Sequence, residues 1–286
     1  MRYAAPTSAA DAVALLKNET AAARVLAGGS DLLVQLNANM VEPALVVDIK
    51  RIPGIRDITA ENGGFRVGAA VTGAEMGEHA GLLALWPGVV EAVELIGSTQ
   101  IQGRATMVGN LCNGSPAADS VPALMAAGAV AGIAGPDGVR DCPVAEIPVS
   151  PGKTSLAAGE FITSIFLPER AARSADAYLR FIPRTEMDIA VASAGVSLTL
   201  GGDGAVSEAR VAVGAVAPTV LLVPEAAACL VGGRAEPEAL QAMGAACSAV
   251  ANPIDDKRGT VEYRTEVVAV LAKRAAKIAF ARAGER

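Results

Sequence analysis

Apolar and polar residues in the first 57 positions follow a pattern that predicts a small unit of helices and strands. Ser8 is well placed to cap a helix over residues 8–18, with Asp11 where a capping box prefers an acid. The predicted order is helix 8–18, strand 23–27, helix 31–40 and strand 45–49. Two short apolar strands joined through a helix indicate a parallel pair with a helical crossover. The first part of the chain is therefore expected to be α/β.

The middle of the chain mixes short strands with short helices. Residues 72–75 have the sequence of a capping box, and residues 136–138 (Pro-Asp-Gly) are typical of a hairpin turn. Residues 97–119 are polar and have no period, which predicts a long loop. The predicted elements are strand 65–71, helix 74–79, helix 87–96, helix 120–127, a hairpin of strands 129–134 and 139–141, and strand 161–167, which Pro168 ends.

The pattern changes after a charged, alanine-rich segment at residues 169–176, where we expect a boundary. Two valine- and alanine-rich strands are joined by the glycine-rich turn 201–204, and helices follow. The predicted elements are strands 189–200, 206–216 and 219–223, and helices near 225–231, 237–250 and 262–283. Strands first and helices afterwards predict an α+β unit.

Composition narrows the possible classes of protein. The 286 residues suggest about two domains, or three small ones. A hydrophobic content of 52% excludes a disordered chain, and a net charge of −6 argues against binding to nucleic acid. The first residues resemble no signal peptide, the longest apolar stretches are too short to span a bilayer, and the four cysteines are widely spaced. We therefore expect a cytoplasmic protein with no metal site of its own.

Two segments carry candidate chemistry. Residues 28–31 (Gly-Gly-Ser-Asp) follow a strand and open a helix, an arrangement that exposes backbone N–H groups to an anion such as phosphate. A glycine turn that only reverses the chain is equally compatible with this segment. Residues 106–119 are dense in small polar side chains, and Asp119 also fits as an acid in the first turn of a helix. The single histidine, His79, is expected to be a surface or capping residue.

These segments resemble the two flavin-binding motifs of the medium subunits of the molybdenum hydroxylases, the xanthine dehydrogenase and carbon monoxide dehydrogenase family. Further segments fit the same family in the same order: residues 47–53, 153–156, 184–190 and 262–264. The resemblance implies a two-domain FAD-binding fold, of the p-cresol methylhydroxylase and molybdopterin dehydrogenase type. The implied division is an α/β domain at 1–57, an α+β domain at 58–174, and a C-terminal α+β domain with a three-stranded antiparallel sheet at 175–286.

The resemblance also implies which residues bind FAD, and that FAD is bound non-covalently. Residues from the first motif would surround the pyrophosphate, residues from the second would meet it from the other side, Asp119 would reach the ribityl chain, and Ile162 would lie against the ring. The implied cofactor-binding residues are Arg24, Ala27, Gly28, Gly29, Ser30, Asp31, Leu32, Thr106, Gly109, Asn110, Asp119, Ile162 and Arg180. No residue of the chain is expected to be catalytic, because FAD carries the redox chemistry.

The implied function is electron transfer inside a complex. Partner subunits would be a small one with [2Fe-2S] clusters and a large one with the molybdopterin cofactor, in a dimer of heterotrimers. One departure is Val108, where the family has a glycine; its side chain either turns inward or keeps the loop away from FAD. Val108 leaves a flavin-free scaffold open as an alternative, and a second alternative is a free-standing flavin oxidoreductase, which would need an acid or base over the ring. Nearby Cys112 is expected to be a buried small hydrophobe.

Overall fold

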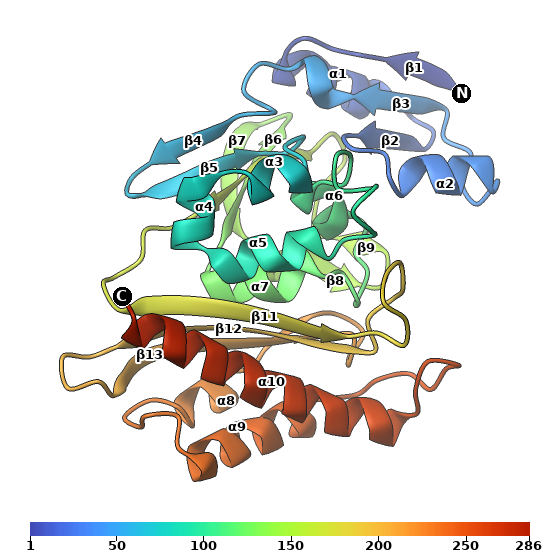
Figure 1. Ribbon diagram of the computed structural model, residues 1–286. Coiled ribbons are helices and arrows are strands. Elements are labelled where there is room, and N and C mark those ends of the chain that lie inside the picture. Colours follow the sequence, from blue (N-terminus) through green and yellow to red (C-terminus); the bar gives the residue numbers. More distant parts are fainter.

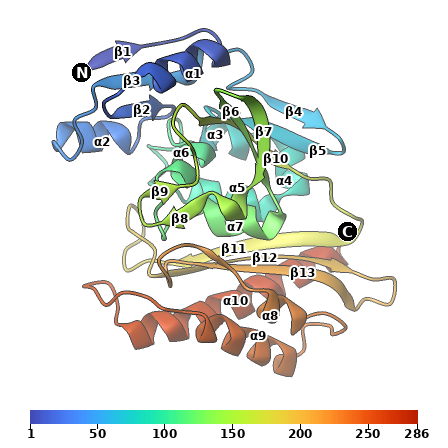
Figure 2. The ribbon, with the colours of Figure 1, turned by 180° about the vertical axis from the view of Figure 1, so that it is seen from behind.

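Three main β-sheets follow one another along the chain in the computed structural model, which describes residues 1–286 (Figure 1). They are called here the N-terminal, middle and C-terminal sheets. Helices α5 (Pro87–Glu94) and α7 (Ser120–Ala127) lie between the middle and C-terminal sheets, and the long helix α10 (Val261–Gly284) covers the far face of the C-terminal sheet (Figures 1 and 2). The predicted mixture of an α/β beginning and α+β remainder is confirmed. None of the helices combines the length and apolar character that crossing a membrane requires.

The N-terminal sheet is parallel and has the strand order β1-β3-β2. Its central strand β3 is buried along its whole length, as expected for a strand with neighbours on both sides. Ser8 caps the first helix by accepting a hydrogen bond from the Asp11 N–H at 3.0 Å. The predicted crossover is confirmed, and strand β1 is an addition. The elements are β1 (Arg2–Ala4), α1 (Ala9–Asn18), β2 (Ala23–Leu26), α2 (Leu32–Asn37) and β3 (Leu45–Asp48).

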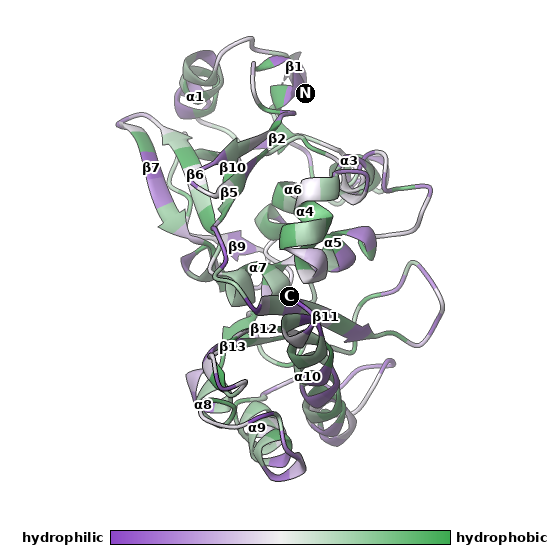
Figure 3. Cartoon of the chain, turned by 60° about the vertical axis from the view of Figure 1, so that its left-hand side comes forward, coloured by the Kyte–Doolittle hydropathy of each residue, from purple (hydrophilic) through white to green (hydrophobic).

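The middle sheet is antiparallel and has the order β4-β5-β10-β6-β7. Edge strand β7 is mostly exposed and carries a hydrophilic stretch with Arg140 and Asp141 (Figure 3), and charges on an edge disfavour pairing of the sheet with another chain. The strands are β4 (Ile58–Glu61), β5 (Gly64–Gly68), β6 (Val130–Gly135), β7 (Gly138–Pro143) and β10 (Phe161–Leu167). The remaining helices are α3 (Gly73–Gly77), α4 (Ala80–Leu85) and α6 (Met107–Cys112), and a hairpin of β8 (Pro148–Ser150) and β9 (Lys153–Thr154) follows.

Two further predictions concern this part of the chain, one for His79 and one for residues 97–119. His79 caps α4, since its Nδ1 accepts a hydrogen bond from the Leu82 N–H at 3.1 Å, as expected of a capping residue. The prediction of an unbroken loop at 97–119 was wrong, because α6 lies inside it. Thr106 caps this helix through a hydrogen bond from the Gly109 N–H. A helix of six residues is too short to show a hydrophobic period.

The C-terminal sheet is antiparallel and has four strands, in the order β11-β12-β13-β14, rather than the expected three. The strand that sequence reasoning missed is β11, because Asp176 and Arg180 interrupt its apolar pattern. Both side chains are buried in ion pairs, which is how a buried strand face tolerates charge. The elements are β11 (Ser174–Phe181), β12 (Ala192–Leu200), β13 (Val206–Gly214), β14 (Leu221–Leu222), α8 (Pro224–Ala228), α9 (Pro237–Ala249) and α10.

The hydrophobic interior consists of two clusters. One cluster of 41 buried residues runs from α1 through the N-terminal and middle sheets, so these two sheets share a core. A second cluster of 25 residues lies between the C-terminal sheet and α8, α9 and α10. Helix α7 is close enough to the C-terminal sheet that a Cβ atom at Gly195 would lie 2.7 Å from the Pro122 carbonyl oxygen.

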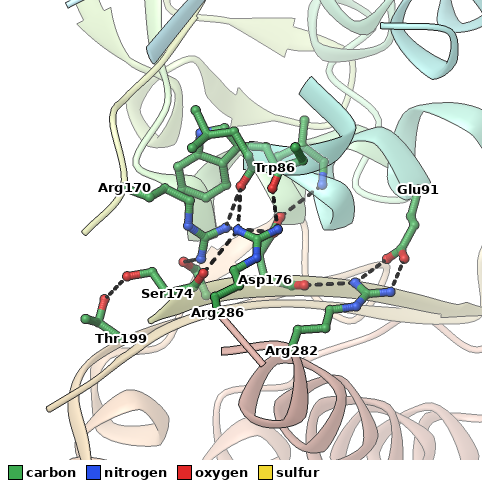
Figure 4. Close-up of polar contacts among 12 residues, drawn as sticks. Trp86, Glu91, Arg170, Ser174, Asp176, Thr199, Arg282 and Arg286 are labelled. Atoms are coloured by element: carbon green, nitrogen blue, oxygen red, sulfur yellow. Dashed lines mark hydrogen bonds and ion pairs between the residues drawn. The ribbon is translucent and has the colours of Figure 1, made fainter. Parts of the chain in front are cut away.

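A polar network, buried around Arg170 and Asp176, joins the end of α10 to the middle sheet's helices (Figure 4). Asp176 of β11 accepts hydrogen bonds from the Val89 N–H at 3.0 Å and from Arg170 at 2.8 Å. The Arg170 guanidinium lies over the Trp86 ring, 4.0 Å from its centroid. Trp86 is 3% exposed and begins α5, so the expectation of a packing anchor there is met. Further contacts come from Arg282, which pairs with Glu91, and from Arg286, which donates to the carbonyls of Ala84, Leu85 and Ser174.

Candidate functional site

The two motif segments, about 75 positions apart in the sequence, meet in the structure. The backbone of Gly28 lies against the segment that precedes α6. A Cβ atom at Gly28 would lie 1.7 Å from the Arg104 carbonyl oxygen and 3.3 Å from the Thr106 methyl group. Only a glycine permits this approach. The contact places the N-terminal sheet's glycine turn directly beside the start of the second motif.

The first motif presents a row of unused hydrogen-bond donors. The backbone N–H groups of Gly28, Gly29, Ser30 and Asp31 donate no hydrogen bond within the chain. Gly29 has a φ of 77°, a left-handed conformation that glycine adopts without strain. Successive backbone N–H groups in a turn with a left-handed residue form anion-binding sites in many proteins. The unused donors favour an anion site over a turn that only reverses the chain.

Cations lie beside the start of this turn. A cavity of about 380 Å³ is lined by Ala27 and Gly28 on one side and by Lys50, Arg56 and Arg104 on the others, together with Ala70, Thr72 and Gly103. Lys50 donates to the Ala27 carbonyl at 3.1 Å and pairs with Asp48, and Arg56 pairs with Glu75. The Arg104 side chain is exposed and has no ion-pair partner. The cavity therefore carries a positive charge that is not neutralised.

Sequence reasoning did not single out these three cations. Lys50 belongs to residues 47–53, which contributed to the family resemblance, so a signal for it existed. Arg56 and Arg104 lie in no recognisable motif. Their position beside Gly28 depends on how the N-terminal and middle sheets pack, and no local pattern encodes that packing.

The second motif is a capped helix start. Gly109 lies so close to Thr106 that a Cβ atom would be 2.7 Å from the Thr106 hydroxyl oxygen. Asn110 accepts hydrogen bonds from the backbone N–H and the hydroxyl of Ser120, at 3.0 and 2.7 Å, and so fixes the start of α7. Val108 is in the first turn of α6, has a negative φ and is 5% exposed. Its side chain therefore points into the core and leaves the cleft side of the motif free.

Asp119 and Arg180 lie together at the junction of α7 and β11. Arg180 donates to one carboxylate oxygen of Asp119 at 2.7 Å, and the Tyr178 hydroxyl donates to the other at 2.9 Å. Asp119 does not cap α7, although it stands at that helix's N-terminus. Burial raises the pKa of Asp119 to about 6, against the opposing effects of Arg180 and Tyr178. Two residues of the C-terminal sheet therefore hold the Asp119 carboxylate, which becomes protonated as the pH falls through about 6.

Comparison with known proteins shows the family of the chain. The family model described as "FAD binding domain in molybdopterin dehydrogenase" matches residues 1–170, and the model described as "CO dehydrogenase flavoprotein C-terminal domain" matches residues 177–279. The chain belongs to this FAD-binding family. The resemblance drawn from the motifs is confirmed, and the protein is a component of an oxidoreductase.

Relatives of this FAD-binding family match almost end to end. The carbon monoxide dehydrogenase medium chain of Hydrogenophaga pseudoflava is 32% identical over 280 residues, which cover 98% of this chain and 97% of the relative. The medium chain from Afipia carboxidovorans is 35% identical over 282 residues, with the same coverage. A structure of carbon monoxide dehydrogenase from Oligotropha carboxidovorans matches with a TM-score of 0.94 at 32% identity, covering 99% of this chain and 98% of that chain.

The residues present fit FAD. The diphosphate of FAD is an anion, and the N–H row at residues 28–31 with the cations around it supplies what an anion requires. Ser30 is half-buried and its hydroxyl makes no hydrogen bond within the chain, so it remains a free donor. Asp31 is exposed and accepts from Gln35, and Leu32 begins α2.

Three other residues lie apart from this contact. Arg24 is exposed on β2 and donates only to the neighbouring Ala23 carbonyl. Ile162 is 2% exposed and lies in the core of the middle sheet, beside an irregularity in the β10–β6 pairing. Cys112 is exposed, so the expectation of a buried small hydrophobe was wrong. It is the last residue of the short helix α6, whose buried side consists of Met107, Val108 and Leu111. The sequence did not predict this helix, so it could not show that Cys112 lies off the buried side.

Proposed function

We propose that this chain is the electron-transferring FAD subunit of a molybdenum hydroxylase, and that FAD lies between its two glycine-bearing segments. The observation that carries the proposal is the contact of Gly28 with Arg104 and Thr106, beside four unused backbone N–H groups. Two loops from different sheets that share one diphosphate would hold these sheets together and fix the position of the cofactor.

The proposed roles combine the geometry with the roles that the family resemblance implies. Ala27 to Leu32 surround the pyrophosphate, with Lys50 and Arg104 supplying charge that sequence reasoning had not assigned. Thr106, Gly109 and Asn110 meet it from the middle sheet. The Asn110 side-chain oxygen is already occupied by Ser120, so its NH₂ group is the part left to donate. Asp119 accepts from the ribityl chain, Ile162 and Arg180 lie near the ring, and Arg24 contributes to the field at the first loop.

The proposal includes partners and a division into domains. Relatives are named as medium chains or FAD-binding subunits, which supports a small [2Fe-2S] subunit and a large molybdopterin subunit as partners, in a dimer of heterotrimers. When bound, FAD supplies the capacity to exchange electrons between the iron–sulfur clusters and an external acceptor. The chain's own residues bind and orient it. The three sheets support domains at 1–57, 58–174 and 175–286. The proposed location is the cytoplasm, as the sequence predicts.

Purification of the tagged chain from its native source tests the proposal. We expect two further subunits to co-purify, together with iron, molybdenum and stoichiometric FAD. A chain that purifies alone with flavin and without these metals would support a free-standing flavin oxidoreductase instead. A chain with no flavin absorption bands, which also takes up no added FAD, would support the scaffold alternative. The inward orientation of Val108 argues against that last outcome.

A further inference from the structure

Strand β11 presents a row of polar side chains to the helices of the middle sheet. Alternate residues of a strand lie on the same face, so Ser174, Asp176, Tyr178 and Arg180 share one face of β11. The first half of this row ends in the network around Arg170 and Trp86 (Figure 4). The second half, Tyr178 and Arg180, ends on Asp119. The C-terminal sheet therefore reaches a residue of the proposed flavin site.

The Asp119 carboxylate is bound at both oxygens but is not saturated. Two oxygens offer about four lone pairs, and Tyr178 and Arg180 use one on each oxygen. About 10% of the Asp119 side chain is accessible, compared with 6% for that of Arg180. Asn110 and Ser120 connect α6 to the residue next to Asp119, so the second motif and this carboxylate form one rigid group. The unused lone pairs are what Asp119 offers to a ligand.

We propose that Tyr178 is a positioning residue of the flavin site: with Arg180, its hydroxyl holds the Asp119 carboxylate oriented and ionised, so that Asp119 accepts hydrogen bonds from the FAD ribityl hydroxyls. This inference rests on the proposed function. It makes the C-terminal sheet a part of the flavin site. Tyr178 itself is 2% exposed and reaches FAD only through Asp119.

The charge balance around Asp119 gives the inference a pH signature. Arg180 is the charged group that faces Asp119, while Tyr178, Ser120 and Asn110 are neutral. The pKa of Asp119 is raised to about 6 because burial outweighs the help of its two partners. Asp119 accepts hydrogen bonds from the ribityl hydroxyls best when it is ionised. The protein therefore binds FAD most tightly well above pH 6, and its affinity for FAD falls as the pH decreases through that value. Removing the Tyr178 hydroxyl removes a hydrogen bond that stabilises the ionised carboxylate, so the loss of FAD affinity begins at a higher pH.

The experiment titrates the full-length apoprotein with FAD and with ADP between pH 5 and 9. ADP carries the diphosphate but no ribityl chain or ring. For Tyr178→Phe we expect the midpoint of FAD affinity to rise by about one pH unit, so that binding weakens about fivefold at pH 6 and about tenfold well below it. Arg180→Gln shifts the midpoint further in the same direction, and Asp119→Asn abolishes it. None of the three changes the affinity for ADP. Thermal unfolding of each apoprotein verifies folding.

Tyr263→Phe is the matched control, since the Tyr263 hydroxyl is on α10, half exposed and without a hydrogen bond. Its profile should equal that of the wild type. The inference is overturned if Tyr178→Phe leaves the midpoint where it was, weakens FAD equally at every pH, or weakens ADP as much as FAD. A wild-type chain that binds ADP and FAD with no pH midpoint also overturns the inference, while leaving the proposed function intact. A wild-type chain that binds neither contradicts the proposed function itself.

Discussion

Replacing Gly28 with alanine tests whether the contact between the two motifs is required. The added Cβ would lie 1.7 Å from the Arg104 carbonyl oxygen and 2.7 Å from its carbon. Both are backbone atoms, so no side-chain rotation relieves the clash. To restore an ordinary contact of 3.4 Å, the two segments must separate by about 1.7 Å, more than half the length of a hydrogen bond. The diphosphate could then no longer reach donors on both sides.

Two losses set the size of the expected effect on stability and on the Kd for FAD. Overpacking at such a contact costs about 1–3 kcal/mol of folding free energy. Losing one charge-assisted hydrogen bond to the diphosphate costs about 2 kcal/mol of binding free energy, which is a roughly thirtyfold increase in the Kd for FAD. Fluorescence quenching of added FAD measures the Kd, and thermal unfolding of the apoprotein measures the stability change.

Gly202→Ala is the matched control, because a Cβ at Gly202, in the turn between β12 and β13, meets nothing within 4 Å. It should leave both quantities unchanged. A Gly28→Ala protein that binds FAD as tightly as the wild type would refute the reasoning, since the two segments would then not need to approach each other.

Three further changes probe the cations and the capping residue. Arg104→Met removes the unpaired cation beside Gly28, so we expect several-fold weaker binding of FAD and of ADP at low salt, a difference that disappears at high salt; Lys277→Met, an exposed cation on α10, should have no effect, and equal effects of the two would contradict a local role. Arg170→Met leaves the carboxylate of Asp176, 3% exposed, without its guanidinium, so urea unfolding should show a loss of about 3–5 kcal/mol; a loss below about 1 kcal/mol would mean that the ion pair does not hold the sheets together. His79→Ala removes the cap of α4 and should cost about 1 kcal/mol of stability with an unchanged Kd for FAD; loss of FAD binding would show that His79 does more than cap.

Local signals in the sequence were sufficient for most of the fold. Caps at Ser8 and Thr72, the turn at residues 136–138 and the valine-rich strands each depend on neighbours in sequence, and the structure has them as predicted. Strand β11 was missed because its charges are neutralised only by residues from other elements. Helix α6 was missed because it is short, and its cap at Thr106 was read as loop chemistry.

The site was predictable in part, for the same reason. The glycines and hydroxyls of both motifs could be found, because a glycine-bearing turn that opens a helix is a local pattern. The cations Arg56 and Arg104, and the hydroxyl of Tyr178, reach the site only through packing between sheets. The orientation of Val108 also required the structure, because a sequence does not say which side of a helix faces the core.

The structure of the chain with FAD bound tests the central claim most directly. We expect the diphosphate to lie between residues 28–31 and residues 106–110, accepting hydrogen bonds from the backbone of the first segment, with the ribityl chain within hydrogen-bonding distance of Asp119. A diphosphate that contacts only one of the two segments, or a flavin bound elsewhere on the chain, would contradict the account.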